Sequence, residues 1–303
     1  MSITERLFAY LAERHPRSSR GVHEARSIEP VRFVEASDRL LTWAERARGE
    51  DAVAACADAF ARFSSDVNLA QARYEAAGEY PNKTHAECEA ELYGQEAMAD
   101  YLWGVYLTNF LWSHHFDLLT WFEDRFVAAL PDQAKLLELA PGHGGWGLTA
   151  LHRRPGSSLV GYDIAPSSIE IATRLANAAD VEDRVDYHRA DATTLEPEPS
   201  VSYDAAICCF LLEHLEQPHR VVEVLAAHLP ERGRAFVTGA LTAAQIDHIY
   251  EFRDESELCL LAEKAGFRVV ETRSLAPQRT LPRAKFLPRS MGLIVERKRE
   301  SAP

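Results

Sequence analysis

A glycine-rich turn after a short apolar run is the first feature of this chain that could do chemistry. Residues 136–147 read Leu-Leu-Glu-Leu-Ala-Pro-Gly-His-Gly-Gly-Trp-Gly. Gly142 and Gly144 can adopt backbone angles closed to other residues, so the main chain can approach a ligand closely. Glu138 would oppose a phosphate, because a phosphate loop does not place an anion beside its anionic ligand. The stretch therefore predicts a nucleotide-like ligand that carries hydroxyls or positive charge.

Further polar residues follow the next apolar runs. Asp163 ends the second run, where a carboxylate can accept both hydroxyls of a ribose. Asp191 follows the third run and could accept a hydrogen bond from the exocyclic amine of adenine. The fourth run leads into Glu213-His214-Leu215. Taken singly, each acid could be only a helix cap.

The elements that must position these residues alternate from Pro131 onward, as in a parallel α/β sheet. Strands are expected at 135–139, 158–162, 185–188, 205–210, 234–238, 268–273 and 292–296. Helices are expected at 167–179, 218–229 and 255–265. Residues 1–130 read as helical throughout. The chain is therefore divided into a helical region, 1–130, and an α/β region, 131–303.

The α/β region resembles the class I methyltransferases that use S-adenosylmethionine (SAM), over about residues 131–297. The glycine-rich turn, Asp163, Asp191 and the Glu213-His214-Leu215 block occur in that family's order and spacing. The resemblance implies a seven-stranded sheet in the order 3-2-1-4-5-7-6, with strand 7 antiparallel. It also implies SAM across the carboxyl ends of strands 1, 2 and 4, with S-adenosylhomocysteine as the product.

The resemblance also assigns donor-binding residues. They are Glu138, Ala140, Pro141, Gly142, Gly144, Asp163, Ile164, Asp191, Ala192, Cys208, Cys209 and Phe210. Asp163 would hold the ribose, Ile164 would pack on adenine, and Asp191 would bind the adenine edge. Ala140 departs from the family, which usually has glycine there. A nicotinamide-binding Rossmann domain also has an acid after strand 2, but it accounts for neither Glu138 nor Asp191.

Methyl transfer to a hydroxyl or amine needs a base, and histidine suits that task near neutral pH. His214, beside Glu213, follows strand 4, and His248 lies on the connection after strand 5 with Tyr250. We expect the base among Glu213, His214 and His248. The alternatives are a structural role for His214 and a surface or capping role for His248.

An aromatic segment at 101–116 precedes the first strand and is too short to span a bilayer. Trp103, Tyr106, Phe110 and His114 share one helical face, with His115 adjacent. Such a face either packs in a core or forms the aromatic wall of a lid over an acceptor. We expect these five residues, with Tyr250, to line the acceptor pocket.

Composition narrows the function. The net charge of -13 disfavours a nucleic-acid partner, and five cysteines without CxxC spacing fit reduced thiols in the cytoplasm. No Asp-Asn pair follows strand 4, so we expect no metal.

The sequence predicts a cytoplasmic, metal-independent methyltransferase for a small aromatic or hydrophobic acceptor of specialised metabolism. It predicts no membrane partner, and a homodimer is possible. The alternatives are a protein or RNA methyltransferase and a non-catalytic SAM-binding regulator.

Overall fold

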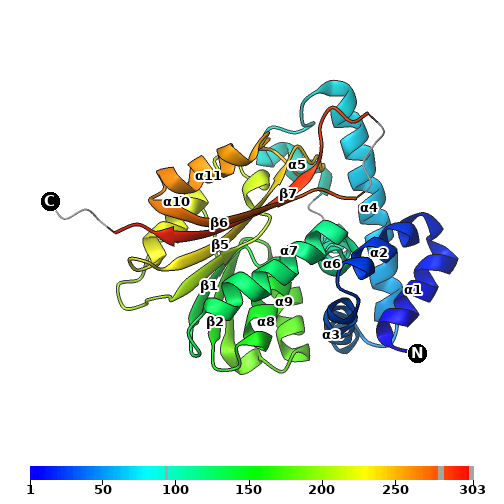
Figure 1. Cartoon of the computed structure of the whole chain (residues 1–303), viewed down its shortest axis with the longest axis horizontal. Coiled ribbons are helices and arrows are strands. Elements are labelled where there is room, and N and C mark those ends of the chain that lie inside the picture. The colour runs from blue at the N-terminus through cyan, green and yellow to red at the C-terminus, as the bar shows by residue number, and fades with distance from the viewer. Residues whose placement is uncertain (93–94, 279–282, 300–303) are drawn as a thin grey trace.

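Seven strands form a single sheet, with the N-terminal helices to one side of it (Figure 1). The structure is a computed structural model and describes residues 1–92, 95–278 and 283–299. The strands are β1 Lys135–Leu139, β2 Ser158–Asp163, β3 Val185–Arg189, β4 Ala205–Cys208, β5 Arg234–Leu241, β6 Phe267–Leu275 and β7 Arg289–Arg297. Their order is β3-β2-β1-β4-β5-β7-β6, and β7 is antiparallel to both neighbours. This confirms the predicted α/β topology.

The strand boundaries differ from the prediction by two or three residues at β4, β5, β6 and β7. β4 ends at Cys208 because Phe210 adopts a positive φ of 52° and donates its N–H to Thr238 Oγ1 at 2.8 Å. β5 continues to Leu241 because its antiparallel pairing with β7 extends beyond the apolar run, as far as Arg289. Hydrophobic pattern therefore located the strands, while pairing with neighbours set their ends.

Helices cover both faces of the sheet (Figure 1). α8 (Gly145–Arg153), α9 (Pro166–Ala178) and the N-terminal helices pack on one face, and α10 (His219–His228) and α11 (Glu255–Lys264) on the other. Along β5, Phe236 belongs to the first core and Val237 to the second, as strand alternation requires. Short helical turns also occur, η3 at Glu182–Arg184 and η4 at Leu212–His214.

The N-terminal region is helical, as predicted. It contains α1 Ile3–Arg14, α2 Pro16–Ile28, α3 Pro30–Arg48, α4 Ala52–Ala77, α5 His85–Leu92, α6 Gln95–Leu111, α7 Ser113–Trp121, the π-helical turn η1 Phe122–Phe126 and the 3-10 turn η2 Val127–Ala129. One hydrophobic core runs from Leu7 and Phe33 to Phe236 of the sheet. The division near residue 130 therefore stays a prediction, because the two regions share that core. None of the helices in the described ranges has the length and apolar character that a bilayer crossing requires.

The fold predicts a large stability loss for Phe236→Ala. Phe236 is fully buried, and its ring lies 4.7 Å from that of Phe122 and 5.7 Å from that of Trp146. Removing the ring leaves a cavity where the helices meet the sheet, so the free energy of unfolding should fall by about 3–5 kcal/mol in urea denaturation. Leu260→Ala, on a side chain of α11 that is 49% exposed, should change it by less than about 0.5 kcal/mol. Similar losses for the two variants would contradict this packing.

Candidate functional site

A cavity of about 1420 Å³ opens at the carboxyl ends of the parallel strands. Its walls come from the β1–α8 turn, the ends of β2 and β4, the β5–α11 connection, and helices α4 and α6. The carboxyl edge between β1 and β4, where strand order reverses, is the usual ligand position in an open α/β sheet. Pockets for one drug-sized ligand measure about 300–1,000 Å³, so this cavity has room for two small molecules.

The β1–α8 turn brings main chain to the cavity. Ala140, Pro141 and Gly142 line it, and both Ala140 and Gly142 have positive φ, 52° and 56°. Left-handed backbone costs a residue with a Cβ about 1–2 kcal/mol, which explains why glycine is usual at the first position. Gly144, predicted to bind the donor, does not line the cavity. A Cβ there would lie 2.8 Å from Tyr187 Oη, so this glycine serves packing of the turn.

Glu138 is buried beneath this turn with one unsatisfied oxygen. Its Oε1 accepts the Gly147 N–H at 3.0 Å, while Oε2 has no hydrogen-bond partner among the described residues. Burial raises the pKa of Glu138 to about 8. A Cβ on Gly147 would lie 2.2 Å from Oε2, so only glycine leaves room for the carboxylate. The Oε2 atom of Glu138 can therefore accept a hydrogen bond from a ligand or pair with a cation.

Carboxylates and one apolar side chain form the neighbouring wall. Asp163 accepts the Gly142 N–H at 3.0 Å and the Ala165 N–H at 2.9 Å. Burial raises the pKa of Asp163. Ile164 lines the cavity although it is 55% exposed, and Asp191 and Ala192 continue the wall. Acids with spare lone pairs beside an exposed apolar side chain fit a ribose and a flat base.

The end of β4 contributes two of its three predicted residues. Cys209 and Phe210 line the cavity, and the Phe210 ring stacks on His115 at 4.8 Å between ring centroids. Cys208 does not reach the cavity, because its side chain lies in the core between the sheet and α10 and α11.

Glu213, His214 and His248 converge at another part of the cavity wall. One ligand atom of each lies within 4.8 Å of the others. His214 Nδ1 lies 3.1 Å from the Asp247 carbonyl oxygen, and His248 Nδ1 lies 2.6 Å from that of Ala243. Because a carbonyl only accepts, each neutral ring carries its proton on Nδ1 and leaves Nε2 as an acceptor. Burial lowers the pKa of His248 to about 3 and raises that of Glu213.

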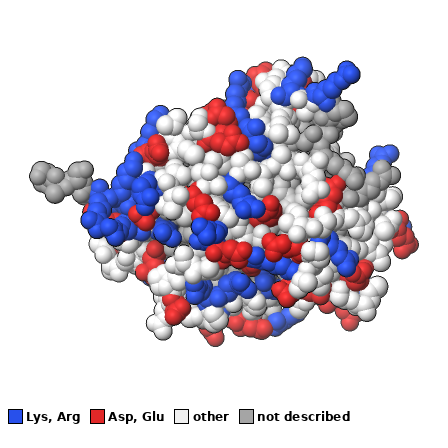
Figure 2. All heavy atoms as spheres, in the orientation of Figure 1, with Lys and Arg blue, Asp and Glu red and all other residues white. Residues whose placement is uncertain are grey.

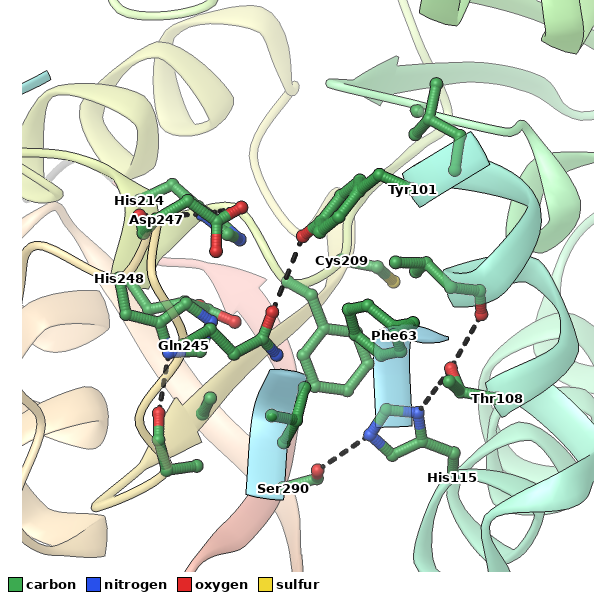
Figure 3. Close-up of a pocket in the computed structure, with 18 of the residues that line it drawn as sticks. Phe63, Tyr101, Thr108, His115, Cys209, His214, Gln245, Asp247, His248 and Ser290 are labelled. Carbon is green, nitrogen blue, oxygen red and sulfur yellow. Dashed lines mark hydrogen bonds and ion pairs between the residues drawn. The ribbon is translucent and has the colours of Figure 1, made fainter. Parts of the chain in front are cut away.

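Figure 3 shows His214, Asp247 and His248 gathered on one side of the pocket and Thr108, His115 and Ser290 on the other. His115 is fixed between Thr108 Oγ1 at 3.0 Å and Ser290 Oγ at 3.1 Å. His114 also lines the cavity, and burial lowers its pKa to about 4. The prediction that both histidines face the pocket agrees with their positions.

The prediction that the aromatic face of α6 lines the acceptor pocket is wrong. Tyr106 donates its hydroxyl to the Leu40 carbonyl at 2.9 Å, Phe110 packs on Phe33, and Trp103 lies under the guanidinium of Arg48. These large rings fill the N-terminal core, so the opposite side of α6 faces the cavity. That side carries Tyr101, Leu102, Val105, Thr108 and Asn109.

Tyr250 is likewise absent from the lining, because its ring packs on Phe252, 4.7 Å away, against the core that α10 and α11 cover.

Several lining residues were missed from the sequence. They are Phe63, Gln71, Trp112, His143, Trp146, Gln245 and Asp247. His143 lies inside the glycine-rich turn, so its position was a visible signal. Its Nδ1 accepts the Gly145 N–H at 2.9 Å, and burial lowers its pKa to about 4, which keeps the ring neutral. Phe63 on α4 stacks on Trp112 at 5.6 Å, a contact with no local sequence signal.

Side chains from the N-terminal region hold the β5–α11 connection that carries His248. Gln71 Oε1 accepts the Ala244 N–H at 2.8 Å, Tyr80 Oη donates to the Ala243 carbonyl at 3.0 Å, and Asn82 Nδ2 donates to that of Ile246 at 2.6 Å. The Ala243 carbonyl thus accepts from both Tyr80 and His248, so the N-terminal region helps to orient the imidazole.

Comparisons with known proteins agree with the donor end of the site. A family model described as "Methyltransferase domain" matches residues 137–235. The ubiquinone biosynthesis O-methyltransferase of Xanthomonas oryzae is 29% identical over 113 residues, 37% of this chain and 46% of that protein. The demethylmenaquinone methyltransferase of Thermus thermophilus is 34% identical over 103 residues, 34% of this chain and 46% of that protein. The chain thus matches less than half the length of these relatives.

Solved structures share the fold over a larger part of the chain. The mitomycin 7-O-methyltransferase MmcR is 18% identical with a TM-score of 0.55, over 81% of this chain and 71% of that one. A Haemonchus contortus phosphoethanolamine N-methyltransferase, solved with S-adenosylhomocysteine, is 15% identical with a TM-score of 0.55. The match covers 73% of this chain and 62% of that one. The family model thus shows a methyltransferase domain over residues 137–235, and the strand order around it is that of the class I, Rossmann-like SAM-dependent methyltransferases.

Proposed function

We propose that the chain transfers the methyl group of SAM to a small molecule bound in the same cavity. One observation carries the proposal: a single cavity joins the acidic, nucleoside-like wall to the Glu213–His214–His248 cluster. Methyl transfer from a sulfonium needs the acceptor atom, the methyl carbon and the sulfur in line, with water excluded. A shared cavity lets the two molecules bind side by side, which supports the proposal.

The donor end supports SAM residue by residue. Asp163 would accept the ribose hydroxyls, Ile164 would pack on adenine, and Asp191 with Ala192 would bind the adenine edge. The unpartnered oxygen of Glu138 would receive positive charge from the methionine part. His143 is neutral beside the turn, so it does not repel a sulfonium.

The acceptor end favours a flat or hydrophobic molecule. Phe63, Trp112 and Phe210 give it aromatic walls, and burial keeps His114 and His115 uncharged. Rings of this kind bind aromatic ligands by stacking and edge contacts. The polar cluster is the part of the cavity that can bind the acceptor's nucleophilic atom and receive its proton. The shared fold of MmcR supports a specialised-metabolite acceptor.

The alternative functions have less support. A protein or RNA substrate would have to reach a cavity that helices α4 and α6 partly cover. Acidic and basic side chains are interspersed on the face in Figure 2, which does not favour a phosphate backbone. A SAM sensor would not need the aromatic walls and the polar cluster beyond the donor.

We expect SAM binding to depend on the ionisation of Glu138. Its pKa of about 8 makes the carboxyl mostly protonated at neutral pH, and a bound cation favours the ionised form. Binding should therefore release a proton and tighten from about pH 6 to about pH 7.5, by at most about tenfold per pH unit. Isothermal titration calorimetry in buffers of different ionisation enthalpy measures both effects.

Glu138→Gln should remove this pH dependence, and SAM affinity should fall. Glu170→Gln, on an exposed pair with Arg174 in α9, is the matched control and should bind SAM like the unaltered protein. Proton release that persists unchanged in Glu138→Gln would contradict the assigned role.

Trp112→Ala should impair the acceptor end alone. Losing the indole removes an aromatic wall, so kcat/KM should fall by about tenfold while SAM affinity is unchanged. The assay measures S-adenosylhomocysteine formed with a panel of phenols, indoles and amines. Trp112→Phe keeps a ring and should retain most of the activity. An equal loss of SAM affinity would place Trp112 at the donor, and no turnover with any acceptor would refute the proposed function.

A further inference from the structure

We propose that Glu213, His214 and His248 bind a divalent transition-metal cation at the acceptor end of the cavity. The inference rests on the proposed function for its purpose, but metal binding can be measured without any acceptor. It runs against the expectation from sequence that no metal is used. That expectation considered only residues directly after strand 4, whereas His248 arrives from the β5–α11 connection.

The geometry suits a shared cation. Glu213 and His214 lie on η4, the turn after β4, and His248 faces them with its ring 4.8 Å from that of His214 and nearly perpendicular to it. Ligand atoms at about 2.1 Å from one metal are at most about 4.2 Å apart. The ligand atoms here lie within 4.8 Å of one another, so small side-chain rotations complete the set.

Both imidazoles are prepared as ligands by the groups behind them. Metal-bound histidines usually donate their other ring N–H to a carbonyl or carboxylate, which fixes the tautomer. His248 does so to the Ala243 carbonyl. His214 does so to the Asp247 carbonyl, and Asp247 Oδ2 lies 3.4 Å from the same nitrogen. The two Nε2 lone pairs are thereby available to a cation.

Glu213 supplies an independent indication of a missing partner. Its side chain is 1% exposed, yet Oε2 has no hydrogen-bond partner among the described residues. A buried carboxylate oxygen without a partner is costly, and a cation would satisfy it.

The donor set indicates the class of ion and its use. Two imidazoles and one carboxylate suit Zn²⁺, Fe²⁺, Co²⁺ or Ni²⁺, and three protein ligands leave a position open. That position would face the cavity, because all three residues line it. A hydroxyl bound there would have a lowered pKa. Its proton would pass to water in the open part of the cavity. The new oxygen–methyl bond would then form as the methyl–sulfur bond breaks.

Cobalt binding tests the site directly. The full-length protein, stripped with chelator, is titrated with Co²⁺ and the visible absorption is recorded. We expect one equivalent to bind and to give d–d bands of a protein-bound, low-coordinate ion. His248→Gln and Glu213→Gln should abolish these bands. Asp247→Asn should weaken Co²⁺ binding by about tenfold or more, because it alters the group behind His214.

Two controls keep the result interpretable. His219→Gln, at an exposed histidine of α10, should leave the cobalt bands unchanged. Circular dichroism spectra and thermal unfolding report that each variant is folded. Cobalt binding that is absent from the unaltered protein, or unchanged in both ligand variants, overturns the metal site. Methyl transfer that survives chelation, with no cobalt bands, also overturns it and leaves the proposed function standing. Cobalt bands without turnover on any acceptor support the metal site and refute the proposed function.

Discussion

The part of the cavity that contains His248 depends on hydrogen bonds between the N-terminal helical region and the β5–α11 connection. The backbone of the β5–α11 connection lies in the interior, where each N–H and carbonyl needs a partner. Gln71, Tyr80 and Asn82 supply these partners from the N-terminal region. Through the Ala243 carbonyl the same contacts orient His248. The N-terminal helices therefore help to build the part of the cavity proposed to hold the acceptor, in addition to covering it.

The donor and acceptor ends differ in how their charge is arranged. The donor end places a buried carboxylate, Glu138, where a cationic ligand can satisfy it. The acceptor end places neutral aromatic rings beside the Glu213–His214–His248 cluster, whose ligand atoms can accept hydrogen bonds or bind a cation. A ligand that complements the donor end would bring positive charge, and one that complements the acceptor end would bring a cation or acidic hydrogens. This difference would order the two proposed ligands within one cavity.

Much of the fold, and the residues at the carboxyl ends of its strands, were predictable because their signals are local. Most central strands are short apolar runs, Asp163 ends β2, and Asp191 comes two residues after β3. The acceptor site was harder. Helical spacing grouped Trp103, Tyr106 and Phe110 correctly on one face, but which side of α6 faces the core is decided by α3 and α4. The approach of His248 to Glu213 depends on the β5–α11 connection, which no spacing rule describes.

The hydrophobic core shared by the helices and the sheet constrains how molecules enter and leave. Phe33 on α3 contacts Phe110 and Phe116, at ring distances of 6.4 Å and 5.3 Å, so α3, α6 and α7 are packed as one body. Swinging that body away would expose the core to water at a large free-energy cost. Ligands would instead have to enter and leave through the open part of the cavity while this body stays in place. The fixed helices would then set an upper limit on the size of an acceptor bound beside the donor.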